Sequence, residues 1–295
     1  MPEKKLNNQH DVAWVGSENG QTLPYQQGAR MNISAIRRTF LFSALGLMLG
    51  TGIAGQAMAG EQLQKIKDSG TLNVGLEGTY PPFSFVDENG KLTGFEVEFS
   101  EALAKELGVK AKIQPSKWDG ILAALDSKRL DVVINQVTIS EERKKKYDFS
   151  EPYTVSGIQA LVLKKNADTI KTAKDLTGKK VGVGLGTNYE QWLKENVPGA
   201  IVKTYDDDPS KIQDLSVGRI DAILVDRLAA LEMATKTKNK LVPAGDAFSR
   251  QESGIALRKG EPELQAAIDK AIDKLRANGT LEKLSKKYFN ADVTK

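Results

Sequence analysis

Cysteine is absent from the 295-residue sequence, and histidine occurs only once, at His10. The chain can therefore form no disulfide, and it offers no thiolate nucleophile. His10 lies in an N-terminal stretch that we expect to be removed, so the remaining chain also lacks an imidazole base and any His or Cys metal ligand. Neither a metal nor a cofactor is expected, although Lys, Tyr and carboxylate chemistry stays possible.

The sequence also lacks a large excess of positive or negative charge. The sequence contains 42 Lys and Arg residues against 38 Asp and Glu residues, a net charge of +4. The densest basic run, Arg143-Lys144-Lys145-Lys146, is interpreted as a solvated helix face, with Arg143 considered separately below. No basic patch is interleaved with aromatic residues, and we therefore expect no nucleic-acid partner.

The sequence has no hydrophobic run of the roughly 20 residues that a membrane-spanning helix needs. The apolar stretch Phe40–Ile53 is shorter, follows Arg37-Arg38 and precedes Ala57-Met58-Ala59, the small-x-small pattern of a signal-peptidase site. We predict that Met31 is the true start of the protein, downstream of the extension 1–30, and that the signal peptide it opens is cleaved after Ala59. A twin-arginine signal, a genuine N-terminal extension and an uncleaved anchor remain alternatives. The mature protein is expected to be periplasmic.

Short β-branched runs alternate with amphipathic helical stretches after residue 60, a pattern typical of α/β proteins with largely parallel sheets. The predicted strands are Leu72–Leu76, Lys110–Gln114, Val132–Gln136, Val181–Leu185, Ile201–Tyr205 and Ala222–Val225. The predicted helices cover the Phe95–Leu107 repeat, Asp119–Leu125, Tyr189–Asn196, Pro209–Val217, Arg227–Thr235, Pro262–Asn278 and Leu281–Phe289, the last with Thr280 as its N-cap.

A weak internal echo relates two parts of the chain. Lys128–Ile134 resembles Gly218–Leu224, since each has a basic residue, an apolar residue and Asp before a buried strand. The echo is either a coincidence of βα patterns or the mark of two lobes of similar build. In the second case the ends of both strands, at Asn135-Gln136 and Val225-Asp226, would face one cleft, because ligands of open α/β sheets bind beyond the carboxyl ends of strands.

Polar and aromatic side chains follow four of the predicted strands. The four segments are Glu77–Phe83, Asn135–Thr138 with nearby Arg143, Gly184–Tyr189, and Asp226. Together they offer a guanidinium, a carboxylate, hydroxyls, amides and aromatic faces, an inventory that fits an α-amino acid zwitterion. For single residues a structural interpretation stays open: Arg143 as a surface charge, Asp226 as a helix N-cap, Trp118 as a core residue, and Gly184-Leu185-Gly186 as a tight strand-to-helix connection.

These segments resemble the polar amino-acid-binding proteins of ABC importers, solute-binding family 3. The similarity is carried by Gly75–Phe83, Gly94–Phe99, Asp131–Val133, Thr138–Arg143, Asp148–Tyr153, Gly178–Val183, Gly218–Ala222 and Gly279-Thr280. Together they extend over most of Glu61–Phe289. Within the family, the chain is most similar to the cystine-binding members.

The resemblance implies roles for individual residues. Arg143 would bind the ligand α-carboxylate with help from Thr187, and Asp226 would bind the α-ammonium with Thr138 and the Asn135 carbonyl nearby. Tyr80 and Trp118 would form aromatic walls. The complete implied set is Glu77, Tyr80, Trp118, Asn135, Gln136, Thr138, Arg143, Gly186, Thr187, Asn188, Tyr189 and Asp226.

The resemblance also implies a type II two-lobed fold, in which each lobe is a mainly parallel sheet flanked by helices. Residues 60–155 with 256–295 would form one lobe and 156–255 the other. The two crossings near Ser156–Ala160 and Glu252–Ala256 would act as a hinge that closes on the ligand. The expected partner is the membrane permease of an ABC importer, and the expected oligomeric state is a monomer.

The ligand that the resemblance favours is L-cystine or a related sulfur amino acid. A basic or other polar amino acid (arginine, lysine, histidine or glutamine) is the alternative, because relatives with basic ligands commonly carry an acidic residue where Glu77 stands. A periplasmic dehydratase on the same scaffold, with Glu77 as general acid, is an alternative of a different class. A chemosensory role beside transport also remains open.

Overall fold

The structure is a computed structural model that describes residues 60–295. The predicted extension 1–30 and signal peptide 31–59 lie outside the described residues. Within the described part, no helix combines the length and the apolar character that crossing a membrane requires.

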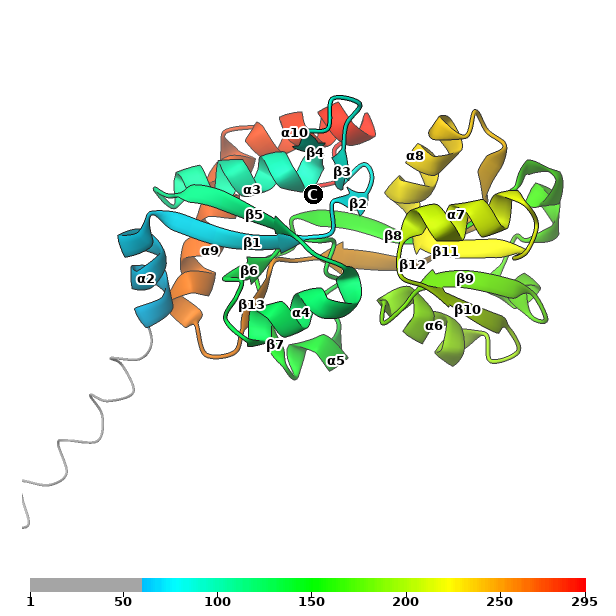
Figure 1. Cartoon of the computed structure of the whole chain (residues 1–295), viewed down its shortest axis with the longest axis horizontal. Helices are drawn as coiled ribbons and strands as arrows, with labels where there is room; N and C mark the ends of the chain where they lie inside the picture. Colours follow the sequence, from blue (N-terminus) through cyan, green and yellow to red (C-terminus); the bar gives the residue numbers. More distant parts are fainter. Residues whose placement is uncertain (1–59) are drawn as a thin grey trace, which may run out of the picture. The chain divides into compact units, whose positions relative to one another are not determined.

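Two five-stranded sheets, each flanked by helices, form two lobes (Figure 1). The first sheet has the order β5-β1-β6-β13-β7, in which β1 runs parallel to β5 and β6, and β13 runs antiparallel to β6 and β7. Its strands are β1 (Thr71–Leu76), β5 (Lys110–Pro115), β6 (Val132–Val133), β7 (Tyr147–Phe149) and β13 (Ala256–Arg258).

The second sheet has the order β10-β9-β11-β8-β12 and repeats this arrangement. Its β9 runs parallel to β10 and β11, and β8 runs antiparallel to β11 and β12. Its strands are β8 (Thr154–Leu163), β9 (Lys180–Gly184), β10 (Ile201–Tyr205), β11 (Ala222–Asp226) and β12 (Leu241–Ser253). A small sheet of β2 (Thr79–Tyr80), β3 (Ser84–Val86) and β4 (Leu92–Thr93) follows β1.

The helices divide between the two lobes. Around the first sheet lie α2 (Glu61–Ser69), α3 (Phe95–Glu106), α4 (Trp118–Asp126), α5 (Glu141–Lys144), α9 (Pro262–Ala277) and α10 (Thr280–Phe289). Around the second sheet lie α6 (Asn188–Asn196), α7 (Asp208–Ser216), α8 (Arg227–Lys236) and two short 3₁₀ helices, η1 (Lys164–Thr169) and η2 (Ala173–Leu176).

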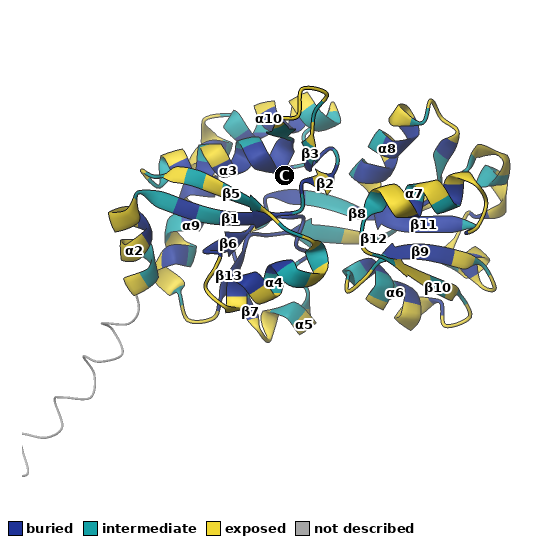
Figure 2. Ribbon diagram, in the orientation of Figure 1, coloured by how far each residue is buried: buried dark blue, intermediate teal, exposed yellow. Residues whose placement is uncertain are grey.

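The apolar spacing of α3 explains its place in the core. Phe95, Phe99 and Leu103 recur every four residues, so they lie on one helix face, and all three are fully buried. Phe95 and Phe99 pack against Tyr153 at the start of β8. Figure 2 shows that the central strands of both sheets are buried, while the outer faces of the helices are exposed. The strand ends are therefore held by rigid cores.

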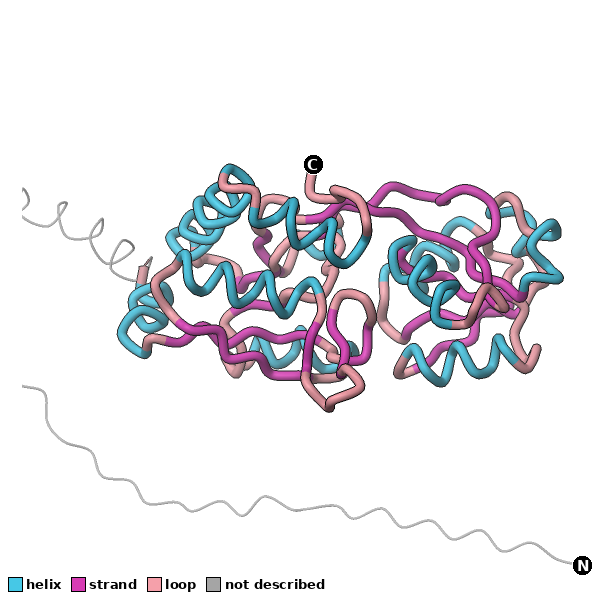
Figure 3. The backbone as a smooth tube through the Cα atoms, turned by 90° about the horizontal axis from the view of Figure 1, so that it is seen from above, coloured by secondary structure: helices cyan, strands magenta, loops and turns pink. Residues whose placement is uncertain are grey.

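Two long strands, β8 and β12, connect the lobes (Figures 1 and 3). They pair antiparallel from Thr154 opposite Ser253 to Leu163 opposite Leu241, with an irregularity between Ala244 and Ser249. At Gly157 an added Cβ would lie 2.8 Å from the Ser249 carbonyl oxygen, so the close approach of the strands there needs glycine. Both predicted hinge segments overlap this connection. The residue boundaries of the lobes stay a prediction.

The structure corrects two predicted boundaries. The strand expected over Val132–Gln136 is limited to Val132–Val133, and Gln136 has a positive φ of 46°, which ends extended geometry. Thr280 is not the N-cap of the last helix. It is the first helical residue, and Gly279 in the left-handed region is the cap.

Candidate ligand-binding site

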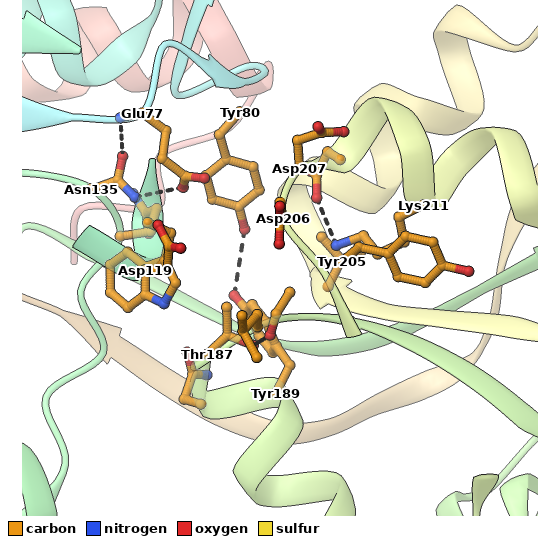
Figure 4. A pocket seen from close by; sticks show the side chains of 17 residues that line it. Glu77, Tyr80, Asp119, Asn135, Thr187, Tyr189, Tyr205, Asp206, Asp207 and Lys211 are labelled. Atoms are coloured by element: carbon orange, nitrogen blue, oxygen red, sulfur yellow. Dashed lines mark hydrogen bonds and ion pairs between the residues drawn. The ribbon is translucent and has the colours of Figure 1, made fainter. Parts of the chain in front are cut away.

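A cleft lies between the lobes, at the carboxyl ends of β1, β9, β10 and β11 (Figure 4). This is the edge of an open α/β sheet at which ligands bind. The lining residues are Glu77, Tyr80, Trp118, Asp119, Asn135, Gln136, Gly184, Leu185, Thr187, Asn188, Tyr189, Tyr205, Asp206, Asp207, Asp208, Lys211 and Val225.

Glu77 and Asn135 form a fixed pair on the first lobe. The Asn135 side-chain oxygen accepts from the Glu77 backbone N–H at 2.8 Å, and its Nδ2 donates to Glu77 Oε2 at 2.8 Å. Burial raises the pKa of Glu77 to about 7, although the hydrogen bond from Asn135 opposes this shift. Near neutral pH, Glu77 therefore presents a mixture of acid and carboxylate to the cleft.

Two contacts cross the cleft. The hydroxyl groups of Tyr80 and Tyr189 lie 3.5 Å apart, and Figure 4 shows them pointing toward one another. Trp118 Nε1 donates to the Gly186 carbonyl at 3.1 Å. Burial raises the pKa of both tyrosines well above the usual value, so both remain neutral donors or acceptors.

Arg143 lies behind Trp118 and does not line the cavity itself. Its guanidinium carbon is 5.2 Å from the Trp118 ring centroid, and Nη1 donates to the Thr138 carbonyl at 3.1 Å. Burial lowers its pKa from the usual value. Within residues 60–295 no carboxylate forms an ion pair with this guanidinium, in contrast to Lys144 and Lys146 on the same run, which are exposed and paired with acids. A partly buried guanidinium in this position is available to an anionic ligand.

Asp226 ends β11 and is 2% exposed. Its Oδ1 accepts from Ser156 Oγ at 2.8 Å and from the Leu228 backbone N–H at 2.7 Å. Asp226 is therefore the N-cap of α8, as the structural interpretation held, and it also lies beside the cleft residue Val225. Burial raises its pKa to about 6, and the hydrogen bonds from Ser156 and the helix N–H groups oppose this shift. A ligand ammonium would compensate the buried negative charge.

The glycine turn after β9 leads into α6. Gly186 has φ 70°, and its N–H donates to Glu190 Oε2 at 2.7 Å. Thr187 caps α6, since its hydroxyl accepts from the Glu190 N–H and donates to the Gly184 carbonyl at 2.7 Å. The turn therefore presents the start of a helix to the cleft, where a carboxylate is favoured.

Gln136 is held from behind by buried groups. Its backbone N–H donates to Glu96 Oε1 at 2.6 Å, and its side-chain oxygen accepts from Thr154 Oγ1 at 2.9 Å. Tyr153 also donates to Glu96 Oε1. Burial raises the pKa of Glu96 to about 7. This network ties a cleft residue to the first residue of the connecting strand β8.

Thr138 and Asn188 meet at a residue that the sequence did not single out. Gln251 of β12 accepts from Asn188 Nδ2 at 3.0 Å and from the Thr138 hydroxyl at 3.4 Å. A residue of the connecting strand thus links the two lobes. No sequence signal marked it, because β12 was not predicted as a strand.

Most of the predicted set lines the cleft. Of the other four residues, Gly186 and Arg143 contact Trp118, Thr138 accepts a hydrogen bond from Arg143, and Asp226 directly follows Val225 in the chain. The residues that sequence reasoning missed are Asp119, Tyr205, Asp206, Asp207, Asp208 and Lys211. The group from Tyr205 to Asp208 follows β10, a strand predicted with the right bounds. If the residues at the carboxyl end of β10 had also been considered as ligand-binding candidates, this group would have been found. The described residues contain no cluster suited to a metal ion.

Comparisons with known proteins place this cleft in context. The model of the family "Bacterial extracellular solute-binding proteins, family 3" matches residues 72–291. The L-cystine-binding protein TcyJ of Escherichia coli K12 is 64% identical over 266 residues, which cover 90% of this chain and 100% of TcyJ.

Solved structures agree with the fold. An ancestral arginine-binding protein bound to arginine aligns with a TM-score of 0.72 and 46% identity, covering 75% of this chain and 98% of that one. The ancestral amino acid-binding protein AncCDT-1, a precursor of cyclohexadienyl dehydratase, aligns with a TM-score of 0.73 and 42% identity, covering 77% of this chain and 99% of that one.

Proposed function

The chain belongs to family 3 of the bacterial extracellular solute-binding proteins, and from this premise we propose that it is the periplasmic component of an ABC importer that binds L-cystine. It is an amino-acid-binding protein and not an enzyme. The observation that carries the choice of ligand is the 64% identity to an L-cystine-binding protein over the whole length of that relative.

The proposed binding mode uses groups of both lobes to hold one zwitterion. Arg143 and the start of α6 would hold the α-carboxylate, and Asp226 would hold the α-ammonium. Charge-assisted hydrogen bonds of this kind contribute roughly 1.5–3 kcal/mol each, so several of them can sustain micromolar binding. Support comes from two charged groups that have no oppositely charged partner within residues 60–295, the partly buried Arg143 guanidinium and the buried Asp226 carboxylate.

The proposal includes closure of the lobes 60–155 with 256–295 and 156–255 about β8 and β12. The contacts between Tyr80 and Tyr189 and between Trp118 and Gly186 already join the lobes across the cleft and support a clamp of this kind. Ligand would favour the closed population because only that population satisfies Arg143 and Asp226 together. A monomer that docks on a membrane permease and is exported by its N-terminal signal peptide completes the proposal.

A basic amino acid is the second candidate ligand. It is favoured by the acidic side chains that line the cleft and by a structural relative that binds arginine. In that case Glu77 would pair with the far end of the ligand side chain.

Thermal unfolding of ligand-stripped protein decides between these candidates. Cystine, cysteine with reductant, arginine, lysine, histidine and glutamine are compared at equal concentration. A ligand at one hundred times its dissociation constant stabilises by about 2.7 kcal/mol, which corresponds to a rise in melting temperature of roughly 5–10 °C for a protein of this size. We expect the largest rise with cystine. A larger rise with arginine or lysine would overturn the choice of cystine.

A further inference from the structure

A buried lysine forms part of the cleft wall beyond the groups assigned to the ligand's α-amino acid end. Lys211 of α7 is only 3% exposed, and its Nζ lies 2.6 Å from Asp208 Oδ1. The other Asp208 oxygen, Oδ2, is buried and has no hydrogen-bond partner among the described residues. Lysine is rarely buried to this extent, and a buried carboxylate oxygen without a donor is costly.

The surrounding backbone leaves room for this lysine. At Gly182 of β9, an added Cβ would lie 3.2 Å from Lys211 Cγ and 3.2 Å from Tyr205 Cε2. The glycine therefore lets the lysine stem and the tyrosine ring lie against the strand. Figure 4 shows Lys211 beside Tyr205, on the opposite side of the cleft from Glu77 and Asn135.

Three other acids of the cleft are already engaged in protein contacts, and the remaining one, Asp119, belongs to α4 of the first lobe. Glu77 is paired with Asn135, Asp207 accepts from the Ser210 N–H as the N-cap of α7, and Asp206 lies 3.5 Å from Lys117 Nζ. Asp208 and Lys211 thus form an ion pair in which one carboxylate oxygen has no hydrogen-bond partner among the described residues.

The same cavity continues from the first binding region to this pair. Tyr80 and Tyr189 line this cavity together with Asp208 and Lys211, and the hydroxyl groups of the two tyrosines lie 3.5 Å apart. A ligand held by Arg143 and Asp226 would therefore extend past the two tyrosines toward α7.

We infer that Lys211 and Asp208 form a second zwitterion site, which binds the distal α-amino acid group of a ligand with two such ends. Lys211 Nζ would donate to the distal α-carboxylate, and Asp208 Oδ2 would accept from the distal α-ammonium. This inference rests on the proposed function, because cystine carries two α-amino acid groups. It also supplies selectivity: a single guanidinium or ammonium at the far end would meet the positive Lys211 without a carboxylate to offer it.

The test uses three disulfide ligands that differ only in the distal half. Cystine has both distal charges, the mixed disulfide of cysteine with cysteamine has only the ammonium, and the mixed disulfide of cysteine with 3-mercaptopropionate has only the carboxylate. The protein contains no cysteine, so it cannot exchange with these ligands. Dissociation constants are measured by calorimetry on ligand-stripped protein.

Lys211→Met should weaken binding of cystine and of the carboxylate-ended disulfide by about tenfold or more. It should not weaken binding of the ammonium-ended disulfide, because it removes a like charge beside Asp208. Asp208→Asn should weaken cystine and the ammonium-ended disulfide instead. Lys286→Met is the matched control, because Lys286 pairs with Glu282 on an exposed helix face. It should bind all three ligands as the wild type does.

The outcomes separate this inference from the proposed function. Unchanged cystine affinity in folded Lys211→Met and Asp208→Asn, or an equal loss of all three ligands, would show that the pair has only a structural role. Lys211→Arg, which keeps the charge, should retain the wild-type ranking of the three ligands and serves if Lys211→Met does not fold. A wild-type protein that does not bind cystine would instead overturn the proposed function.

Discussion

The first and second sheets begin with the same three-stranded parallel core, β5-β1-β6 in one lobe and β10-β9-β11 in the other. An aspartate precedes the third strand in both. The N–H of Asp131 donates to the Asn73 carbonyl and that of Asp221 to the Lys180 carbonyl, and each carboxylate accepts the N–H of the same partner at 2.7 Å. The internal echo in the sequence thus corresponds to one repeated structural unit.

The two lobes differ in the residues that come directly after these strands. In the first lobe, Asn135 locks Glu77 in a hydrogen-bonded pair, and burial raises the pKa of that acid to about 7. In the second lobe, Asp226 is held by a serine hydroxyl and a helix N-terminus, with a pKa of about 6. The shared scaffold therefore fixes the position of each acid, while the residues just after these strands decide which hydrogen-bond partners hold it.

Replacing the charged residue that each lobe would supply to the ligand should have the largest effect on cystine affinity. Asp226→Asn retains a side chain that can cap α8, and Arg143→Ala removes the guanidinium. Each should lower the affinity for cystine by about 30-fold or more, because a buried ligand charge that loses its partner costs roughly 2–5 kcal/mol. Calorimetry on ligand-stripped variants provides the measurement.

Lys145→Ala is the control for these variants, because Lys145 is exposed on the same basic run as Arg143. Its cystine affinity should equal that of the wild type. Near-normal affinity in folded Arg143→Ala and Asp226→Asn would contradict the proposed binding mode.

Sequence reasoning identified the repeated units because their signals are local. The strand Ile201–Tyr205 has the predicted bounds, and the predicted helices differ from the observed ones by at most one residue at each end. The connecting strands β8 and β12 escaped prediction. Most of β8 is buried on both faces and so shows no alternation, and β12 is interrupted by an irregularity near Gly245.

A position in the cleft was predictable where a side chain lies at or just beyond the end of a strand, as for Glu77 and Asn135. The buried position of Lys211 on α7 was not predictable, because it depends on the space left by Gly182 of β9. Gln251 was missed for a similar reason, since its contacts join segments more than 60 residues apart in the sequence. Tertiary packing, which has no local pattern, decides such positions.

The raised pKa values predict opposite pH dependences for folding and for binding. Between the ordinary values and about 6 or 7, the folded protein binds protons at Asp226 and Glu77 more tightly than the unfolded chain does. The free energy of unfolding of ligand-free protein should therefore fall as the pH rises from 5 to 7. Cystine affinity should rise over the same range, because the ligand ammonium favours ionised Asp226.

Urea unfolding and calorimetry at pH 5, 6 and 7 measure both trends. Residues 60–295 contain no histidine, so none in this part of the chain titrates in this window. Asp226→Asn should flatten the stability profile by removing the contribution of Asp226, and Glu77→Gln should flatten its upper part. A wild-type protein that becomes more stable as the pH rises would show that burial does not dominate the titration of these acids.

The turn aspartates Asp131 and Asp221 provide the comparison with the smallest expected effect on cystine affinity, since they lie away from the cleft. Asp131 is 6% exposed and accepts three hydrogen bonds, from Gln62 Nε2 at 2.7 Å and from both the N–H and the Nδ2 of Asn73, whereas Asp221 accepts one, from the Lys180 N–H. Each buried donor left without an acceptor costs about 1–3 kcal/mol. We therefore expect Asp131→Ala to lower the free energy of unfolding by about 2–4 kcal/mol and Asp221→Ala by about 1 kcal/mol, with cystine affinity unchanged in both. Equal losses in urea unfolding would mean that only the backbone contact common to both turns matters, and that the two lobes are equally dependent on it.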